Sequence, residues 1–525
     1  MLSLSHTLRL LPALLLGLFA LSANAQSFRV QCPTSTTLHL SDPADPAANP
    51  IGGRIKCQQL SGGDGFATMG DGTQTYLFGF GPLSGLADLA KGLPGTQSAS
   101  VFINDNSLNL DSIFIGAPVD QTSGSPSGYS FNGAIGMVPN VEANNGAGPT
   151  GPLDGHVDPR MIMDVGVMNA NQPAPMIAID EDDELFLTLT NVGQVMRPDL
   201  FEQHTVHFHG YPNASAFYDG VPDASVAISI GASFTYYYLA PDAGTYFWHC
   251  HISPPEHLQM GMVGQLYVRP RQNRALPSQT LYSFQQDQQV DKRTRSDCNA
   301  DILCSSPLPP ADNGVKGGGM YAYNDGDGST RYDVEYPIQI HGFDPNFHFV
   351  GMTFNPESFT DMKDKHFLLN GRSYPDTVQP GPMTTQSTDG TMHASQPLPT
   401  IINIPAGGKA LLRLSGLSVT EYHTLASLGV PMRVIGWNAR LLRDLAGGDM
   451  TYQTNSISLA GGESADVLLE ATGPDFASCT TQAPCKYYLY TPNLDHLSND
   501  AENFGGLMTE VNVCTAVDQK TKACI

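Results

Sequence analysis

The sequence is poor in charged residues, which make up 14% of its 525 positions. Basic residues are the scarcest, with 26 Lys and Arg against 50 Asp and Glu, so the formal net charge at pH 7 is −24. A protein of this charge repels nucleic acid and anionic lipid, and neither is expected as a partner. The acidic excess favours cationic partners or metal ions, unless it serves solubility alone.

Long apolar runs are also missing, except at the start of the chain. Residues 1–25 contain one Arg, an apolar stretch and the small residues Ala23-Asn24-Ala25 before Gln26. The stretch is shorter than the ~20 apolar residues that a membrane span needs. This pattern is typical of a secretory signal peptide. We therefore expect a periplasmic or secreted protein without a membrane span.

Helical periodicity is scarce, whereas Gly (53 residues) and Pro (39 residues) are abundant. Residues 175–191 and 400–418 share one pattern, in which two strands flank a turn. Residues 457–513 similarly repeat the pattern of 227–268. The sequence therefore predicts an all-β fold with two Greek-key β-sandwich domains of the same kind and long loop insertions.

The predicted boundaries follow these patterns and the composition between them. Residues 324–333 (NDGDGSTRYD) have the oxygen-rich composition of a calcium loop, although a plain turn is the simpler interpretation. The expected segments are a signal peptide (1–25), a first domain with an N-terminal extension and an insertion (26–270), a linker (271–332), a second domain (333–514) and a C-terminal tail (515–525).

The nine cysteines leave one without a nearby partner. Cys250 is the odd one, and it lies between two histidines. A lone cysteine is often only a small buried hydrophobic residue, but these flanks point to a metal site. In an exported protein the other eight predict four local disulfides: 32/57, 298/304, 479/485 and 514/524.

Histidines gather in two short segments, FEQHTVHFHG (201–210) and GTYFWHCHISPPEHLQMGM (244–262). Successive side chains on a strand point to opposite faces of a sheet. His204 therefore points away from the other two histidines of its segment, and Cys250 points away from both of its neighbours. Two clusters are expected back to back. One holds His204 and Cys250, with His257 and Met262 from the following loop, and the other holds His207, His209, His249 and His251.

The two clusters offer different ligands. Two imidazoles, a thiolate and a thioether are the ligand set of a blue-copper centre, with Met260 as a weaker rival to Met262 for the axial position. Four imidazoles without a carboxylate suit copper better than calcium or magnesium, and zinc remains an alternative for them.

These two segments resemble the copper-binding segments of multicopper oxidases, a family of cupredoxin domains that includes laccases, ascorbate oxidases and bilirubin oxidases. The resemblance implies cupredoxin-like domains, copper as cofactor and an exported oxidoreductase. Electrons would enter at a type 1 copper and pass through His-Cys-His to a second copper centre, and from there to dioxygen. The implied ligands are His204, Cys250, His257 and Met262 for type 1 copper, His207 for type 2 copper, and His209, His249 and His251 for the type 3 pair.

The sequence departs from the family pattern in three respects. Five residues separate His251 from His257, where the family has three. The type 1 ligands lie in the first copper domain, as they do in the trimeric two-domain oxidases and copper nitrite reductases. After residue 251 there is no His-x-His, so the second domain is degenerate. The second centre would then be closed either by residues 333–514 of the same chain or by a neighbouring subunit, and the resemblance to the two-domain relatives favours the neighbour, in a homotrimer. Nitrite chemistry is disfavoured, since its catalytic Asp would fall at His207.

Two further questions stay open at this point. The electron donor is a small molecule, a metal ion or a protein. The alternative to an oxidase is a blue-copper electron-transfer protein, or a copper-binding protein, without a trinuclear centre.

Overall fold

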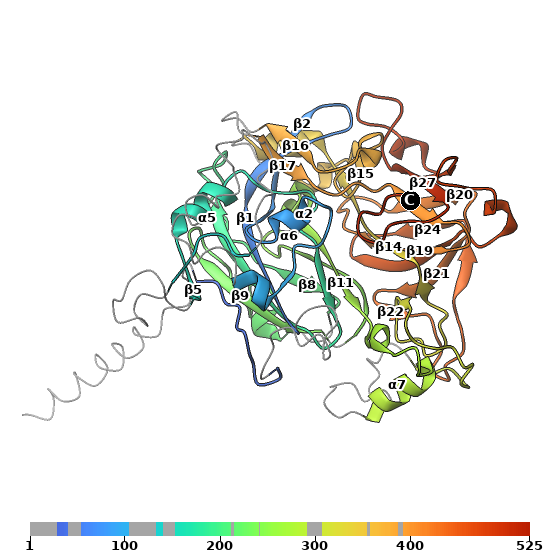
Figure 1. The fold of residues 1–525 in the computed structure, drawn as a ribbon. Helices are drawn as coiled ribbons and strands as arrows, with labels where there is room; N and C mark the ends of the chain where they lie inside the picture. The colour runs from blue at the N-terminus through green and yellow to red at the C-terminus, as the bar shows by residue number, and fades with distance from the viewer. Residues whose placement is uncertain are drawn as a thin grey trace, which may run out of the picture.

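Two pairs of β-sheets follow one another along the chain in the computed structural model, the first in blue and green and the second in orange and red (Figure 1). The predicted signal peptide and the Cys298/Cys304 pair lie outside the residues that the structure describes. Within those residues, no helix is long and apolar enough to cross a membrane. The described residues are 29–39, 54–103, 133–139, 153–211, 215–240, 242–290, 307–353, 358–386 and 392–525.

The first pair joins a five-stranded sheet to a four-stranded one. The five-stranded sheet has the order β2 (Gln74–Pro82), β1 (Ile55–Thr68), β7 (Glu184–Gly193), β9 (Ser233–Leu239), with β3 (Gln97–Ser98) beside β1. The four-stranded sheet has the order β6 (Ile177–Asp180), β11 (Val263–Arg269), β10 (Gly244–His249), β8 (His207–His209). Strands β1 and β7 are parallel, as are β6 and β11.

The second pair is built from a seven-stranded and a five-stranded sheet. The larger sheet has the order β15 (His366–Leu369), β14 (Val334–Phe343), β19 (Lys409–Gly416), β25 (Glu463–Glu470), β21 (Met432–Trp437), β22 (Arg440–Leu441), with β23 (Tyr452–Thr454) beside β21. The smaller sheet has the order β18 (Ile402–Pro405), β27 (Met508–Cys514), β26 (Cys485–Tyr490), β20 (His423–Leu428), β24 (Ser456–Leu459).

The two pairs share one topology. The order β1-β7-β9 corresponds to β14-β19-β25, and the order β6-β11-β10-β8 corresponds to β18-β27-β26-β20. The strand senses agree as well, because the first two strands of each series are parallel and the later neighbours antiparallel. The predicted all-β fold with two sandwiches of the same kind is confirmed.

Short helices and minor strands connect the sheets. The helices are α2 (Leu86–Leu89), α3 (Ala99–Ile103), α5 (Pro159–Gly166), α6 (Pro254–Met260), α7 (Leu281–Val290) and α8 (Pro345–Gly351). The minor strands are β4 (Met137–Pro139), β5 (Leu153–Val157), β12 (Met320–Tyr321), β13 (Arg331–Tyr332), β16 (Met383–Gln386) and β17 (Met392–Gln396). Helix α7 lies inside the segment predicted to be a linker.

The oxygen-rich segment 324–333 folds as a turn around Asp325. The Asp325 carboxylate is fully buried and accepts hydrogen bonds from Gln272 Nε2 at 2.7 Å and from the backbone amides of Gly328 and Thr330 at 2.8 Å each. Donors of the protein itself therefore satisfy this carboxylate, which favours the plain-turn interpretation over a calcium loop.

The four-stranded sheet of the first pair packs against the seven-stranded sheet of the second. Thr245 of β10 donates a hydrogen bond to Asp466 of β25 at 2.6 Å, and Gln265 of β11 donates one to the carbonyl of Arg413 in β19 at 2.8 Å. Across the same interface, Arg269 of β11 pairs with the buried Glu335 of β14 at 2.7 Å. A buried charge left without its partner would cost several kcal/mol, so these contacts fix how the two pairs sit together.

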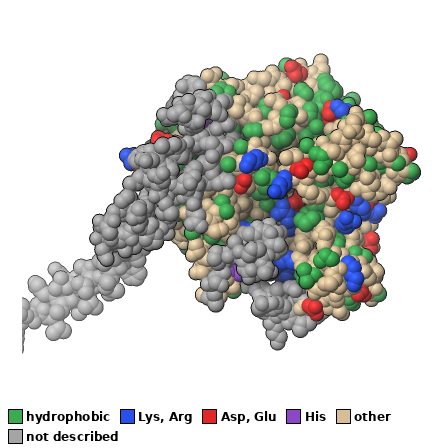
Figure 2. Space-filling view, in the orientation of Figure 1, with side chains coloured by type: hydrophobic (Ala, Val, Ile, Leu, Met, Phe, Trp, Pro, Cys, Tyr) green, Lys and Arg blue, Asp and Glu red, His purple; other side chains and the backbone are tan. Residues whose placement is uncertain are grey.

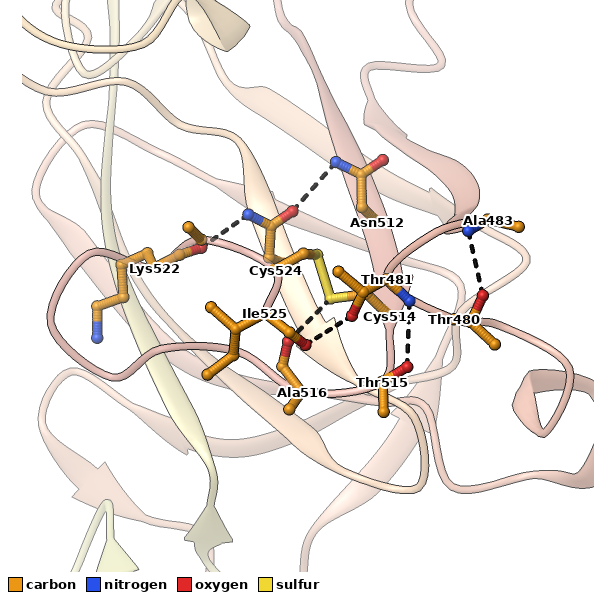
Figure 3. Close-up of a disulfide and its surroundings, with 12 residues drawn as sticks. Thr480, Thr481, Ala483, Asn512, Cys514, Thr515, Ala516, Lys522, Cys524 and Ile525 are labelled. Carbon is orange, nitrogen blue, oxygen red and sulfur yellow. Dashed lines mark hydrogen bonds between the residues drawn. A yellow bond between two sulfur atoms is a disulfide. The ribbon is translucent and has the colours of Figure 1, made fainter.

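Three of the four predicted disulfides are present, namely Cys32–Cys57, Cys479–Cys485 and Cys514–Cys524. Figure 3 shows the last of these, which ties the C-terminal tail to the end of β27. Cys250 is free and buried, as its place among the histidines led us to expect. On the face shown in Figure 2, acidic and basic side chains are interspersed among uncharged ones, so the acidic excess forms no continuous patch there.

Candidate metal centres

Antiparallel pairing of β8 with β10 brings the histidines of the two segments together. His207 lies directly opposite His249, and His209 lies opposite Phe247. Because residues two apart on a strand share a face, all three imidazoles project to the same side of the sheet. The ring centroid of His207 is 5.2 Å from that of His249 and 5.7 Å from that of His209. We call these three residues, with His251, the four-histidine face.

His251 follows the end of β10 and sits at the edge of this face. Its ring centroid is 5.0 Å from that of His207 and 5.7 Å from that of His249. The nitrogens of His207, His209 and His249 all lie within 4.8 Å of one another, a group to which His251 does not belong. The predicted face is thus assembled as three close imidazoles and a fourth beside them.

Backbone carbonyls orient two of these rings. Nδ1 of His207 donates to the carbonyl of Asp219 at 2.7 Å, and Nδ1 of His249 donates to the carbonyl of Cys250 at 2.8 Å. Each Nε2 then keeps its lone pair for a metal ion. Burial lowers the pKa of all three close imidazoles, that of His249 to about 3, so the rings are neutral at pH 7.

The opposite side of the same strands carries the second set of ligands. Nitrogen atoms of His204 and His257 and the sulfur of Cys250 all lie within 4.8 Å of one another, and Cys250 Sγ is 3.3 Å from His257 Nδ1. All three side chains are fully buried. We call them, with Met262, the cysteine site.

The cysteine site has polar atoms that lack partners. Neither ring nitrogen of His204 has a hydrogen-bond partner among the described residues, although the side chain is fully buried. Burial raises the pKa of the Cys250 thiol to about 11 and lowers that of His257 to about 3, so all these groups are neutral at pH 7. Unpaired buried nitrogens are rare in folded proteins, and a soft metal ion would both satisfy them and displace the thiol proton. The donor set therefore fits copper.

Helix α6 explains the five residues that precede His257. Pro254 and Pro255 occupy its first positions, where proline needs no amide hydrogen, and Gly261 ends it at φ 117°. The sequence predicted a loop here. This seven-residue helix absorbs the two extra residues and returns His257 to Cys250.

The backbone places Met262 next to both neighbouring ligands. Its carbonyl accepts the amide of Cys250 at 3.1 Å, and its own amide donates to the carbonyl of His257 at 2.8 Å. The sulfur of Met260 lies beside Gly351, because a Cβ built on that glycine would be 3.1 Å from it. Both thioethers are fully buried. This arrangement favours Met262 over Met260 as the fourth ligand.

Two neighbours of the centres left no signal in the sequence. Glu202 Oε2 lies 3.8 Å from His257 Nε2, and the carboxylate is partly exposed. Burial and the nearby Glu256 raise the pKa of Glu202. Phe247 stacks on His209 with ring centroids 4.5 Å apart. Only the pairing of β8 with β10 and the path of the 200–204 segment reveal these contacts.

Residues of the second sheet pair cover part of the four-histidine face. They line one wall of a pocket of about 260 Å³ whose other wall contains His209 and His249. His209 itself remains exposed. The covering residues are Leu417, Ser418, Val419, Gly461 and Gly462.

No histidine of the second pair reaches this group of ligands within the described residues. His341 Nε2 donates to the carbonyl of Leu258 at 2.9 Å, and His423 Nδ1 is hydrogen-bonded to Ser418 Oγ at 2.9 Å. Both partners line the pocket, so the two rings lie one residue behind its wall.

The same region of the chain matches known proteins. The profile of the multicopper oxidase family matches residues 154–273. Laccase abr2 of Aspergillus fumigatus is 34% identical over 112 residues, which are 21% of this chain and 18% of that protein. L-ascorbate oxidase of Cucumis sativus is 31% identical over 112 residues, again 21% and 18%. The matched part thus spans about a fifth of the length of these relatives.

Solved structures were compared as well. The blue copper oxidase of Nitrosomonas europaea aligns with a TM-score of 0.47 at 17% identity, covering 87% of this chain and 85% of that one. A multicopper oxidase named mgLAC aligns with the same TM-score at 15% identity, covering 88% of this chain and 87% of that one.

Proposed function

We propose that the chain is a copper-dependent oxidoreductase, on the premise that its residues 154–273 form a multicopper oxidase domain. The observation that carries the proposal is the back-to-back placement of two ligand groups on β8 and β10. Copper held by them would supply reversible one-electron chemistry, taking electrons from a donor at one group and delivering them to dioxygen at the other.

The cysteine site is the proposed point of electron entry, as type 1 copper. His204, Cys250, His257 and Met262 are the side chains that would hold this ion, and their two imidazoles, thiolate and thioether would suit it for one-electron transfer. Burial of all four side chains keeps water from the metal. A fixed and dry ligand set favours fast electron transfer because little has to reorganise.

The peptide bonds around Cys250 form the proposed path between the centres. Cys250 belongs to the cysteine site, whereas its neighbours His249 and His251 belong to the four-histidine face. The hydrogen bond from His249 Nδ1 to the carbonyl of Cys250 adds a second link over the same short distance. Only a few bonds therefore separate the two metal positions.

The four-histidine face, as type 2 and type 3 ligands, is the proposed site of dioxygen reduction. Its histidines alone are too few for a trinuclear cluster, and the exposed edge of His209 leaves room for further ligands. A neighbouring subunit in a homotrimer is the proposed source. Export to the periplasm or the medium is part of the same proposal, and the donor is a small molecule, a metal ion or a protein.

One observation favours the alternative function, an electron carrier. Among the described residues, the second sheet pair contributes no ligand atom to the four-histidine face. If no other subunit completes the face, the protein would accept and return electrons at the cysteine site alone.

Copper counting combined with spectroscopy and oxygen uptake separates the two functions. An oxidase would hold two or more copper ions per chain, with both type 1 and type 2 signals, and would consume oxygen with a donor. One copper per chain with only a type 1 spectrum, in a monomer by light scattering, would contradict the oxidase and establish the carrier.

A further inference from the structure

A third group of metal-binding side chains lies apart from the copper ligands. Atoms of Asp71, His366 and Asp500 all lie within 4.8 Å of one another. Asp71 belongs to the turn between β1 and β2, so the first sheet pair supplies it. His366 begins β15 and Asp500 lies in the segment between β26 and β27, so the second sheet pair supplies both. The group therefore bridges the two pairs.

His366 lacks the partners that a buried histidine needs. Its side chain is fully buried, and neither ring nitrogen has a hydrogen-bond partner among the described residues. Within that part of the chain, His204 of the cysteine site is the other histidine in this condition. His348 shows the usual arrangement, since its two ring nitrogens lie within hydrogen-bond distance of the backbone carbonyls of Tyr76 and Gln259. A polar group that is buried without a partner loses its hydration and gains nothing in return, so His366 is expected to have a partner.

The backbone holds both carboxylates near this ring. Asp71 Oδ1 accepts the amide of Thr73 at 2.9 Å, which fixes the side chain within its turn. The amide of Asp500 donates to the carbonyl of Lys365 at 3.0 Å, directly beside His366. Asp500 adopts the left-handed conformation at φ 47°, which Asp accepts more readily than most residues.

A glycine permits the close approach of the two sheet pairs at this point. A Cβ built on Gly70 would lie 2.7 Å from Asn499 Nδ2 and 2.9 Å from Ser373 Cβ. The backbone of His366 also forms a β-bridge with Asn499. The turn that carries Asp71 therefore packs directly on the segment that carries Asp500.

The spacing and the ligand types suit a small divalent ion. Ligand atoms bound about 2.1 Å from one ion lie roughly 3–4 Å from one another, so the present separations need only a small adjustment. An imidazole favours a first-row transition metal over calcium or magnesium, and two carboxylates suit its charge. Asp500 is exposed and Asp71 partly so, which gives an ion and its remaining water ligands access from solvent.

We propose that Asp71, His366 and Asp500 bind one divalent transition-metal ion of the zinc class, separate from the copper centres, which ties the β1–β2 turn to the second sheet pair. The ion would satisfy the buried imidazole and cross-link residues 71 and 500. It has no part in electron transfer.

Zinc binding by the copper-loaded, full-length protein tests this proposal. Occupied copper sites leave the Asp71–His366–Asp500 group as the place for zinc. Equilibrium dialysis with elemental analysis should find one zinc per chain and an unchanged copper content. The variants Asp71→Asn, His366→Ala and Asp500→Asn should each bind zinc at least tenfold more weakly. The controls Asp475→Asn and His156→Ala, at exposed positions elsewhere, should bind it as the wild type does.

Thermal unfolding gives a second readout from the same proteins. Zinc should raise the Tm of the wild type and both controls and leave the Tm of the three site variants unchanged. If His366→Ala does not fold, Asp500→Asn at the surface still carries the test. Copper in place of zinc, lost from the same three variants, would also support the site. A copper-loaded wild type that binds no stoichiometric zinc and holds no copper that the three site variants lose, or an Asp500→Asn protein that binds the metal unchanged, would overturn the proposal.

Discussion

The two sheet pairs place different side chains on the same framework. In the first pair, two stretches supply all eight candidate copper ligands, one from His204 to the end of β8 and one from His249 at the end of β10 to Met262 just before β11. The corresponding β20 and the segment between β26 and β27 contain only His423 and His496. Both frameworks keep their strand order and senses. Sheet topology therefore does not require the ligands, and the proposed metal chemistry depends on about 60 residues of the first pair.

His423 and His496 of the second pair have partners that suit a structural role. His423 Nδ1 is hydrogen-bonded to Ser418, and His496 Nε2 lies 2.8 Å from Glu421 Oε2. His496 also stacks on Phe367 with ring centroids 4.2 Å apart. The second pair instead covers part of the four-histidine face, because residues near Ser418 and Gly462 form one wall of the pocket that contains His209 and His249.

The largest expected effect comes from Cys250→Ser, which removes the thiolate ligand. The corresponding segment of the second pair has no cysteine. A hydroxyl cannot supply the thiolate-to-copper charge transfer that gives a blue-copper centre its colour. The visible absorption and donor oxidation should both disappear. Circular dichroism should be unchanged, since the core strands do not depend on the metal. A variant that stays blue would refute the ligand assignment.

Replacing one histidine by alanine in each of the corresponding strands β8 and β20 compares the metal-binding roles of the two sheet pairs directly. His207→Ala should lower donor-dependent oxygen uptake at least about tenfold and reduce the copper content. His423→Ala should leave copper content unchanged and lower the free energy of unfolding by about 1 kcal/mol, through loss of its hydrogen bond to Ser418. Copper analysis and denaturant unfolding measure both. Equal copper loss from the two variants would show that the pairs share the metal.

Leucine at the two methionines tests the fourth ligand with a smaller effect. Met262→Leu should shift the visible spectrum and reduction potential of the cysteine site, since the axial ligand tunes both. Met260→Leu should leave both unchanged. Each swap conserves volume and should cost less than about 1.5 kcal/mol in stability. A spectral shift in Met260→Leu alone would reverse the assignment.

Opening a disulfide of the second pair should affect stability and leave the copper sites alone. The double variant Cys514→Ala/Cys524→Ala frees the tail shown in Figure 3 and should lower the free energy of unfolding by about 2–3 kcal/mol. Its copper spectrum should match that of the wild type. A changed spectrum would mean that the second pair reaches the cysteine site through contacts beyond those described.

Strand alternation was sufficient to predict the back-to-back arrangement of the ligands. His207, His209 and His249 share a face, and Cys250 lies opposite, because the side-chain period of a strand is two. Local pairing of cysteines likewise predicted the three disulfides of the described residues.

Long-range packing could not be predicted in the same way. Ser418 and Gly462 lie more than 150 residues after the histidines in sequence. They form a wall of the pocket only because of how the two sheet pairs pack together. The sequence around Pro254, Pro255 and His257 is compatible with either a loop or a short helix, and only the structure shows that it is helical. The approach of Asp71 to Asp500 joins distant turns that share no sequence pattern.

Anomalous diffraction at the copper edge tests the central claim most directly, because it locates each copper ion in the fold. We predict one ion between His204, Cys250 and His257, and further copper on the opposite side between His207, His209 and His249. No copper should lie beside His423 or His496. A single ion at the cysteine site, or an ion bound by the histidines of the second sheet pair, would contradict the account.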